Sequence, residues 1–320
     1  MPCSLYALCV IPLPERQLIQ RLRRRIRGRH AVLGIGDDCA ILRIAPGHEA
    51  LVTTDFSLEG VHFRRAWQSP EGIGHRCLVR GLSDIAAMGG RPIAAFLSLA
   101  LPNNVPQRWV DRFFAGLLRL ADKHEVELAG GDTSQSPAGV LADIAVVGSV
   151  PKGKALRRSG ARVGDHIYVT GEFGESAASL QLLRQKKIRK RDVFPDPRTA
   201  VGEWLGANGI ASACIDLSDG LSTDLAHLSE ESGVGAVVNA AAIPIHPAAR
   251  KLRNALDLAI HGGEDYELLF SARKNAPVPA QIAGVPITRV GEIISGGAVR
   301  LSQTGKSRVL APGGWEHFRP

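Results

Sequence analysis

The chain has 320 residues, is 45% hydrophobic and carries a formal net charge of +8. This length and hydrophobic content are sufficient for one large domain or for two of ordinary size. The five cysteines form no Cys-x-x-Cys pair, and no uncharged apolar run is long enough to span a bilayer, which argues against a secreted disulfide framework and against a membrane protein. We therefore expect a cytoplasmic protein with reduced thiols.

The first half of the chain predicts three helices and four strands. The helices are indicated by apolar residues at helical spacing, as at Trp109, Phe113 and Leu117, and the strands by short alternating apolar runs. The predicted helices are 15–27, 70–88 and 107–124, and the predicted strands are 31–35, 50–54, 93–101 and 141–150.

After residue 150 the sequence becomes polar, basic and glycine-containing, so we predict a boundary there, with domains 1–150 and 151–320. The second half predicts helices 175–185, 198–207, 221–231 and 247–258, and strands 166–170, 211–215, one around 237, 266–272, 287–294 and 299–301. Helices that alternate with strands in both halves predict a two-domain α/β (or α+β) protein.

Six acidic motifs indicate the chemistry, because in each a short apolar run leads to Asp or Glu beside Gly, Ser or Thr. They contain Asp37-Asp38, Asp55, Asp84, Asp132, Asp216 with Asp219, and Glu264-Asp265. Any one of them has a structural explanation, since Asp caps helices and forms turns. Carboxylates that converge in space, however, repel one another unless cations lie between them. Oxygen ligands without His or Cys favour Mg²⁺, so we expect these motifs to follow strand ends and to converge on several magnesium ions and a phosphate substrate.

One segment nearly matches the P-loop pattern G-x-x-x-x-G-K-[ST]. It runs from Gly148 to Lys154, but Ala155 replaces the hydroxyl that would hold Mg²⁺, and Pro151 removes a backbone donor. No helix is predicted after the lysine, so we do not expect a P-loop here.

Arginines are crowded between Arg21 and Arg29. Our interpretation is a solvated helix face, and the alternative is a patch that attracts polyanions. The run has no interleaved aromatic residues, and we find no helix-turn-helix or zinc-finger pattern. We therefore do not expect nucleic acid as a partner.

The motifs of this chain, taken in order, resemble those of bacterial thiamine-monophosphate kinase. They read GIGDDCA, TTD, LSDIAAMGG, AGGDT, GKALRRSGARVGD, YVTG, IDLSDGLSTDL and GGEDYELLF, and a C-terminal GGWEHF extends the likeness. The resemblance implies the fold of aminoimidazole ribonucleotide synthetase. In that fold the N-terminal domain binds metal and ATP and forms a barrel across a homodimer, and the C-terminal domain completes the nucleotide and substrate site. It also implies a magnesium-dependent transferase that uses ATP to convert thiamine monophosphate to thiamine diphosphate.

The resemblance further implies three sets of site residues. The positions that match metal ligands are Asp38, Thr53, Thr54, Asp55, Asp84, Asp132, Asp216 and Asp219. The positions that match ATP contacts are Gly131, Asp132, Arg158 and Ser218, and those that match contacts to thiamine monophosphate are His62, Glu264 and Trp315. No residue is assigned as a general base, because a phosphate monoester is largely a dianion at neutral pH and is already a nucleophile.

Two other activities on the same fold are alternatives. A protein resembling selenophosphate synthetase would need a reactive Cys beside a Gly-rich N-terminal segment, whereas Cys3 and Cys9 lie in an apolar stretch. A hydrogenase-maturation protein would need a C-terminal Cys, whereas this chain ends in Pro320. The departures from the kinase pattern are the extension 1–14, the arginine run, and Gly81 where the family often has Asn.

Overall fold

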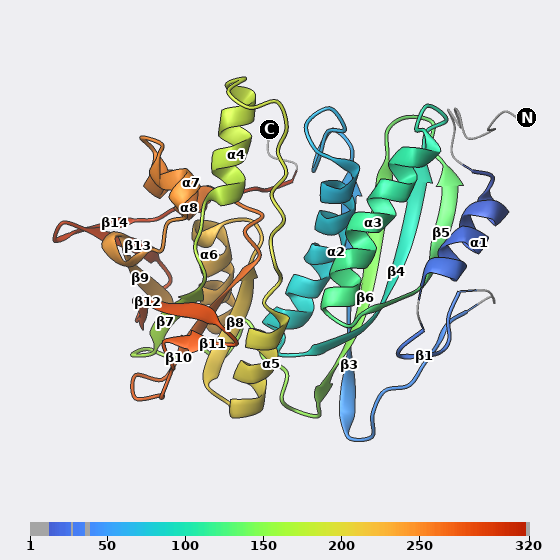
Figure 1. Cartoon of the computed structure of the whole chain (residues 1–320). Coiled ribbons are helices and arrows are strands. Elements are labelled where there is room, and N and C mark those ends of the chain that lie inside the picture. Colours follow the sequence, from blue (N-terminus) through green and yellow to red (C-terminus); the bar gives the residue numbers. More distant parts are fainter. Residues whose placement is uncertain (1–12, 27, 36–38, 318–320) are drawn as a thin grey trace, which may run out of the picture.

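The computed structural model describes residues 13–26, 28–35 and 39–317. Figure 1 shows two α/β units side by side, with helix α2 (Pro70–Ala87) in the middle of the molecule. The two-domain α/β class predicted from the sequence is confirmed. The position of the boundary at residue 150 stays a prediction, and so does the barrel across a homodimer.

The N-terminal unit is a four-stranded sheet with helices on one face. The strand order is β3 (His48–Leu58), β6 (Leu141–Pro151), β4 (Arg91–Leu101) and β5 (Glu127–Gln135). β6 runs antiparallel to β3 and β4, whereas β4 and β5 are parallel. The covering helices are α2 and α3 (Gln107–Lys123), and a hairpin of β1 (Ala31–Leu33) and β2 (Ile41–Leu42) lies beside β5.

The other face of this sheet is open. Alternate residues of β3 point to it, and Val52 is 69% and Phe56 56% exposed, whereas Leu97 and Ile144 on neighbouring strands face the helices and are buried. Because strand side chains alternate between the two faces, the same alternation decides which polar residues of β3 can meet α2.

The C-terminal unit is a larger, mostly antiparallel sheet. Its order is β14 (Lys306–Val309), β13 (Val299–Gln303), β9 (Gly235–Asn239), β12 (Val285–Ile294), β7 (His166–Thr170), β10 (Glu267–Ala272) and β8 (Ala211–Leu217), with β11 (Gln281–Ile282) paired to β12. Its helices are α4 (Glu175–Arg184), α5 (Thr199–Asn208), α6 (Leu221–Ser232), α7 (Pro247–Arg250) and α8 (Ala255–His261), and a 3-10 turn spans Ala240–Ala242. Side chains of α6 and α8 pack on one face, and those of α5 and the end of α2 pack on the other.

Helix α2 therefore belongs to both cores. Its last turn, at Ala86 and Ala87, packs with Leu205 of α5 and with Phe270 of β10. Tyr266, which precedes β10, is in turn buried in the core of the N-terminal unit. This interlocking fixes the face of α2 that is turned toward β8 and the loop before β10.

Most predicted elements are present, with some differences. β5 was missed, because its Gly130-Gly131-Asp132 sequence resembles a turn. The short strands β2, β11 and β14 were also missed, β3 is longer than predicted, and the predicted helix 247–258 is two short helices, α7 and α8. Residues 152–165, after the near-match to a P-loop, contain no helix, as expected.

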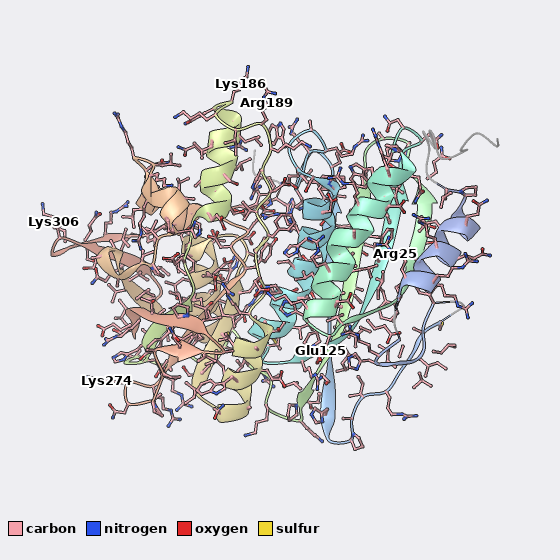
Figure 2. All side chains as sticks on the ribbon, in the orientation of Figure 1. Arg25, Glu125, Lys186, Arg189, Lys274 and Lys306 are labelled. Atoms are coloured by element: carbon pink, nitrogen blue, oxygen red, sulfur yellow. The ribbon has the colours of Figure 1, made fainter. Side chains whose placement is uncertain are left out.

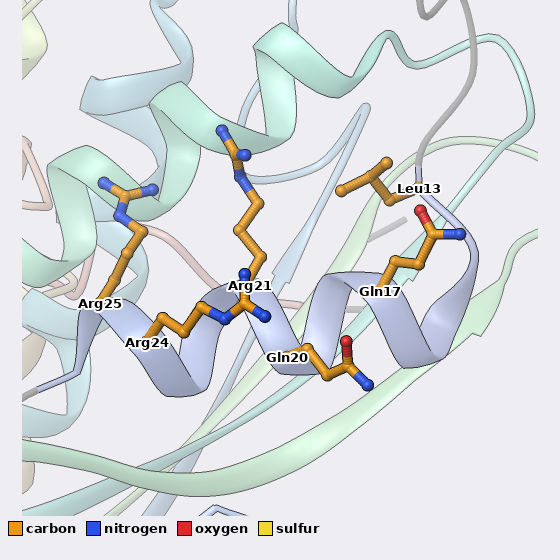
Figure 3. A pocket seen from close by; sticks show the side chains of 6 residues that line it. All are labelled: Leu13, Gln17, Gln20, Arg21, Arg24 and Arg25. Atoms are coloured by element: carbon orange, nitrogen blue, oxygen red, sulfur yellow. The ribbon is translucent and has the colours of Figure 1, made fainter.

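Helix α1 (Glu15–Arg25) packs on α3 through Leu18 and Leu22. Arg21 forms two 2.8 Å hydrogen bonds with the carboxylate of Asp111 on α3. A hollow of ≈ 520 Å³ beside this helix is lined by Leu13, Gln17, Gln20, Arg21, Arg24 and Arg25, whose side chains are drawn in Figure 3. Part of the arginine run is thus used in packing, and the extension 1–14 lies outside the described residues except for its last two.

Charged side chains lie on the surface, and Lys186, Lys274 and Lys306 project outward from the molecule (Figure 2). No helix of the described chain is both long and apolar enough to cross a bilayer.

The contact between α2 and α3 needs two glycines. A Cβ on Gly116 would lie 2.0 Å from the carbonyl oxygen of Glu71, and one on Gly74 would lie 2.0 Å from that of Phe113. We predict that Gly116→Ala lowers the free energy of unfolding by about 1–3 kcal/mol, because the two helices must move apart to make room for the added methyl group. Urea denaturation measures the change. Gly297→Ala, where no atom lies within 4 Å, is the control and should stay within about 0.5 kcal/mol of the original protein. Equal stability of the two variants would contradict this account of the helix contact.

Candidate active site

Carboxylates from three elements meet where α2 faces β3 and β8. The Oγ1 of Thr53 on β3 donates a hydrogen bond to Asp84 on α2. One residue earlier on the helix, the Ser83 hydroxyl donates to Asp216 of β8 at 2.8 Å. Asp55, two residues after Thr53, lies on the same face of β3. We call Thr53, Asp55, Asp84 and Asp216 the carboxylate cluster.

Burial and mutual repulsion raise the pKa values of the carboxyl groups in the cluster. Burial, followed by the charge of Asp84, raises the pKa of Asp55 to about 7. Burial and the same neighbour raise the pKa of Asp216 to about 7. Burial also raises the pKa of Asp84, although the Thr53 hydrogen bond opposes the change. The three carboxyl groups of the cluster can therefore all be ionised at neutral pH only if additional positive charge lies close to them.

The loop after β8 adds groups of both signs. Asp219 lies near Asp216, and its pKa is raised by burial. The charge of Arg158 acts on Asp84, Asp216 and Asp219, which places this residue beside the cluster. Ser218 lies between the two aspartates, and its carbonyl oxygen accepts a 2.7 Å hydrogen bond from the backbone N–H of Glu264.

The cluster fits a hard divalent cation in part. Carboxylate and hydroxyl oxygens are ligands that Mg²⁺ prefers, and buried carboxylates that repel one another are stabilised by a cation between them. Within residues 13–26, 28–35 and 39–317, however, no three His, Cys, Asp or Glu side chains form a ready-made metal site. An ion held here would thus take further ligands from water, from phosphate oxygens or from residues outside this set, which is how Mg²⁺ is commonly bound.

The C-terminal tail crosses this loop and reaches the N-terminal unit. The backbone N–H of Gly314 donates to Thr223 at 3.1 Å, and that of Trp315 donates to the carbonyl oxygen of Asp219 at 3.1 Å. The Trp315 ring is 49% exposed and meets His317 edge-on at 5.5 Å. His317 in turn lies 5.4 Å from the ring of His62, which follows β3.

His62 is held as a neutral ring. Its Nδ1 accepts a 3.0 Å hydrogen bond from the backbone N–H of Leu58. Burial, and then the positive charge of Arg80, lowers the pKa of His62 to about 4. His62, Trp315 and His317 therefore form an aromatic group at one end of the cluster. The His62 ring of this group is neutral at pH 7.

Glu264 is surrounded by three arginines. Its carboxylate lies 2.5 Å from Arg76, 3.1 Å from Arg80 and 2.9 Å from Arg191. Burial would raise the pKa of Glu264, but Arg76, Arg191 and Arg80 together hold it well below its usual range. Sequence reasoning missed these arginines. The spacing of Arg76, Arg80 and Asp84 at i, i+4 and i+8 could have revealed the first two, since such residues share one helix face, whereas nothing in the sequence pointed to Arg191.

Two predicted site residues point away from the cluster. Thr54 lies on the open face of β3, between Thr53 and Asp55. Asp132 on β5 shares a row with Ser98 and Asp143 across the sheet, again on the open face. β3 and β5 are the two edges of this sheet, so three strand spacings of about 4.8 Å, or roughly 14 Å, separate Asp132 from Asp55.

The packing of the sheet requires glycine at position 131. The φ of Gly131 is 145°, and a Cβ there would lie 2.0 Å from the carbonyl oxygen of Leu97 on β4. Only glycine fits at this position in the strand, whether or not a nucleotide approaches it.

The expectation that the aspartates follow strand ends was wrong for three of them. Asp55 and Asp132 lie within strands, and Asp84 lies within a helix, whereas only Asp216 and Asp219 stand at the end of a strand. The short motifs show which residues are adjacent in sequence but not which element carries them. Asp38 lies outside the described residues. The roles of all the site residues stay predictions.

Comparison with known proteins places the chain among characterised relatives. Residues 36–150 match the family model of the AIR synthase related protein, N-terminal domain, and residues 162–302 match that of its C-terminal domain. The chain is 36% identical over 324 residues to the thiamine-monophosphate kinase of Escherichia coli K12, an alignment that covers 95% of this chain and 98% of the relative.

Solved structures agree. The thiamine-monophosphate kinase of Stenotrophomonas maltophilia K279a superimposes with a TM-score of 0.81 at 37% identity, covering 90% of this chain and 96% of that one. AaThiL complexed with AMPPCP and TMP superimposes with a TM-score of 0.77 at 29% identity, covering 95% of each chain.

The cluster makes a prediction about cation binding without substrate. We expect saturating Mg²⁺ to raise the Tm of the original protein, because it neutralises Asp55, Asp84 and Asp216 only in the folded state. In Asp55→Asn most of this shift should be lost, while the Tm without Mg²⁺ should be equal or higher, since one repelling charge is gone. Differential scanning calorimetry measures both. Asp122→Asn, which removes a surface carboxylate on α3, is the control and should keep the full shift. An unchanged shift in Asp55→Asn would show that Mg²⁺ binds elsewhere.

Proposed function

Because this chain belongs to the thiamine-monophosphate kinase family, we propose that it transfers the γ-phosphate of ATP to thiamine monophosphate, giving thiamine diphosphate and ADP. The observation that carries the proposal is the buried carboxylate cluster, whose members repel one another, together with the group formed by His62, His317 and Trp315, which is joined to the loop after β8 by the hydrogen bond from Trp315 to Asp219. The carboxylate cluster suits a metal-bound polyphosphate, and the aromatic group suits a flat organic cation.

Asp55, Asp84, Asp216 and Asp219, with Thr53, would hold the magnesium ions. Bound Mg²⁺ supplies charge neutralisation, which lets a phosphate dianion approach a triphosphate. The protein itself contributes position. α2, β3 and the end of β8 are rigid elements, and the hydrogen bonds Thr53–Asp84 and Ser83–Asp216 orient two of the carboxylates. Fixed carboxylates on rigid elements can hold donor and acceptor in line, which favours direct transfer.

The acceptor needs no general base. The phosphate of thiamine monophosphate is largely a dianion at neutral pH and attacks as it stands. His62 matches a position that contacts thiamine monophosphate in the family, and its pKa of about 4 makes it a weak base at pH 7. We assign it, with Trp315, to the aromatic part of the substrate, where a half-exposed indole can stack on a cationic thiazolium ring.

We also propose that the working unit is a homodimer. The open face of the N-terminal sheet presents Val52 and Phe56 to solvent, and β3 is an edge strand with no further strand paired to it among the described residues, both of which favour pairing with a second copy. Asp132 is remote from the carboxylate cluster of its own protomer. It would contribute, with Gly131, to the ATP and metal site of the partner.

The direct test is an assay of product formation. With Mg²⁺ and ATP, thiamine monophosphate should yield thiamine diphosphate and an equal amount of ADP, as measured by chromatography. Free thiamine should give no product above background, because its hydroxyl needs a base that the site lacks. If thiamine were phosphorylated at a comparable rate, the base-free mechanism would be wrong. If neither compound were phosphorylated, the assigned reaction would be wrong.

A complementation experiment tests the shared site. Asp55→Asn and Asp132→Asn should each be nearly inactive as homodimers. If Asp132 serves the partner's site, a heterodimer has one intact site and one doubly altered site. An equimolar co-expressed mixture should then recover about a quarter of the original activity, since half of the dimers are mixed and each has one working site of two. A mixture no more active than its components would place both residues in the same protomer's site.

A further inference from the structure

One face of α2 connects the two ends of the proposed site. Arg76, Arg80 and Asp84 succeed one another at four-residue intervals, so they rise along the helix in steps of about 6 Å. Asp84 belongs to the carboxylate cluster, and Arg76 lies 2.5 Å from Glu264. Arg80 stands between them.

Arg80 has fewer partners than the other two arginines around Glu264. Arg76 also donates to Ser176 at 2.9 Å, and Arg191 donates to Ser176 and, at 2.9 Å, to Ser179. For Arg80 the structure shows one hydrogen bond, from Nη2 to Glu264 at 3.1 Å. Its Nε is buried and has no hydrogen-bond partner among the described residues.

A second buried donor accompanies it. The hydroxyl of Tyr266 likewise has no partner in the described part of the chain, and its residue is 1% exposed. The charge of Arg80 interacts with Tyr266, Glu264 and Asp55, so the guanidinium is close to the cluster as well as to the loop before β10. A buried donor without a partner is costly in free energy, which makes this an incomplete polar site.

The local charge favours an anion. Three guanidinium groups surround the carboxylate of Glu264, so positive charge exceeds negative charge there even when Asp55, which interacts with Arg80, is counted. The side chain of Arg80 is still 15% exposed. Arginine is suited to this role because its planar group can donate two parallel hydrogen bonds to phosphate oxygens.

We infer that Arg80 binds the phosphate of the acceptor substrate and sets the preference for a phosphorylated over an unphosphorylated acceptor. The inference rests on the proposed function. An acceptor whose ring system lies against Trp315 and whose phosphate reaches the carboxylate cluster passes Arg80, with Tyr266 as a second donor. A structural role for Arg80, as a counter-ion of Glu264 alone, would instead affect all ligands of the site alike.

The experiment compares two ligands that differ only in the phosphate. Calorimetric titrations with thiamine monophosphate and with thiamine, at fixed Mg²⁺, are made on the original protein, on Arg80→Met and on Arg76→Met. In Arg80→Met we expect the affinity for thiamine monophosphate to fall roughly 10–100-fold, the usual effect of losing a hydrogen bond to a charged group. The affinity for thiamine should change less than about 2-fold. Arg80→Lys should recover part of the loss, because it restores the charge without the planar fork.

Arg76→Met is the matched control, since it removes another guanidinium from Glu264 one turn farther from Asp84. We expect it to change the affinities for the two ligands by the same factor. Equal losses for both ligands in Arg80→Met, or no loss in either, would overturn the inference, as would a loss confined to an ATP analogue. Failure of the proposed function would look different, because the original protein itself would then bind thiamine monophosphate no better than thiamine and form no product.

Discussion

The structure depends on the packing of α2 into both hydrophobic cores, which holds like charges buried where the two domains meet. Asp55, Asp84 and Asp216 come from a strand, a helix and a strand of the other sheet, and burial raises the pKa of each. Such an arrangement is unfavourable in an isolated protomer unless cations or protons compensate it. It persists because α2 is packed into both hydrophobic cores, so the cost in free energy is met by apolar burial elsewhere. A site of buried carboxylates that repel one another is therefore a consequence of how the domains are joined.

Helix α2 also positions different groups of the site at different points along its length. Its last turns carry Ser83 and Asp84 toward the carboxylate cluster, and an earlier turn carries Arg76 to Glu264. The C-terminal tail closes the opposite side, since its backbone is hydrogen-bonded to the loop after β8 and its aromatic residues reach His62. A metal-bound donor and an organic phosphate acceptor would thus meet over one rigid element, which suits a reaction that needs alignment more than acid–base chemistry.

Much of this was predictable, and the misses have physical causes. The order of the acidic motifs was sufficient to indicate the family and the kind of ligand. β5 was missed because Gly130 and Gly131 resemble a turn, whereas the strand needs Gly131 to pass close to Leu97 of β4. Asp84 was expected at a strand end from its motif, although the predicted helix 70–88 already contained it, and the structure confirms the helix. Arg80 was not recognised, since its importance depends on Glu264, which is 184 residues away.

By itself the sequence determined the chemical inventory: oxygen ligands without Cys or His companions, and helix and strand periodicities that place a core. These are properties of single residues and near neighbours, so they can be read locally. Only the tertiary structure decided which oxygens act together. In β3 the period of two turns Thr53 and Asp55 toward α2 and Thr54 away from it. In the four-stranded sheet the strand order sends Asp132 to the far edge. Both outcomes depend on which face is buried and on which strands pair, and those are settled by contacts between distant segments.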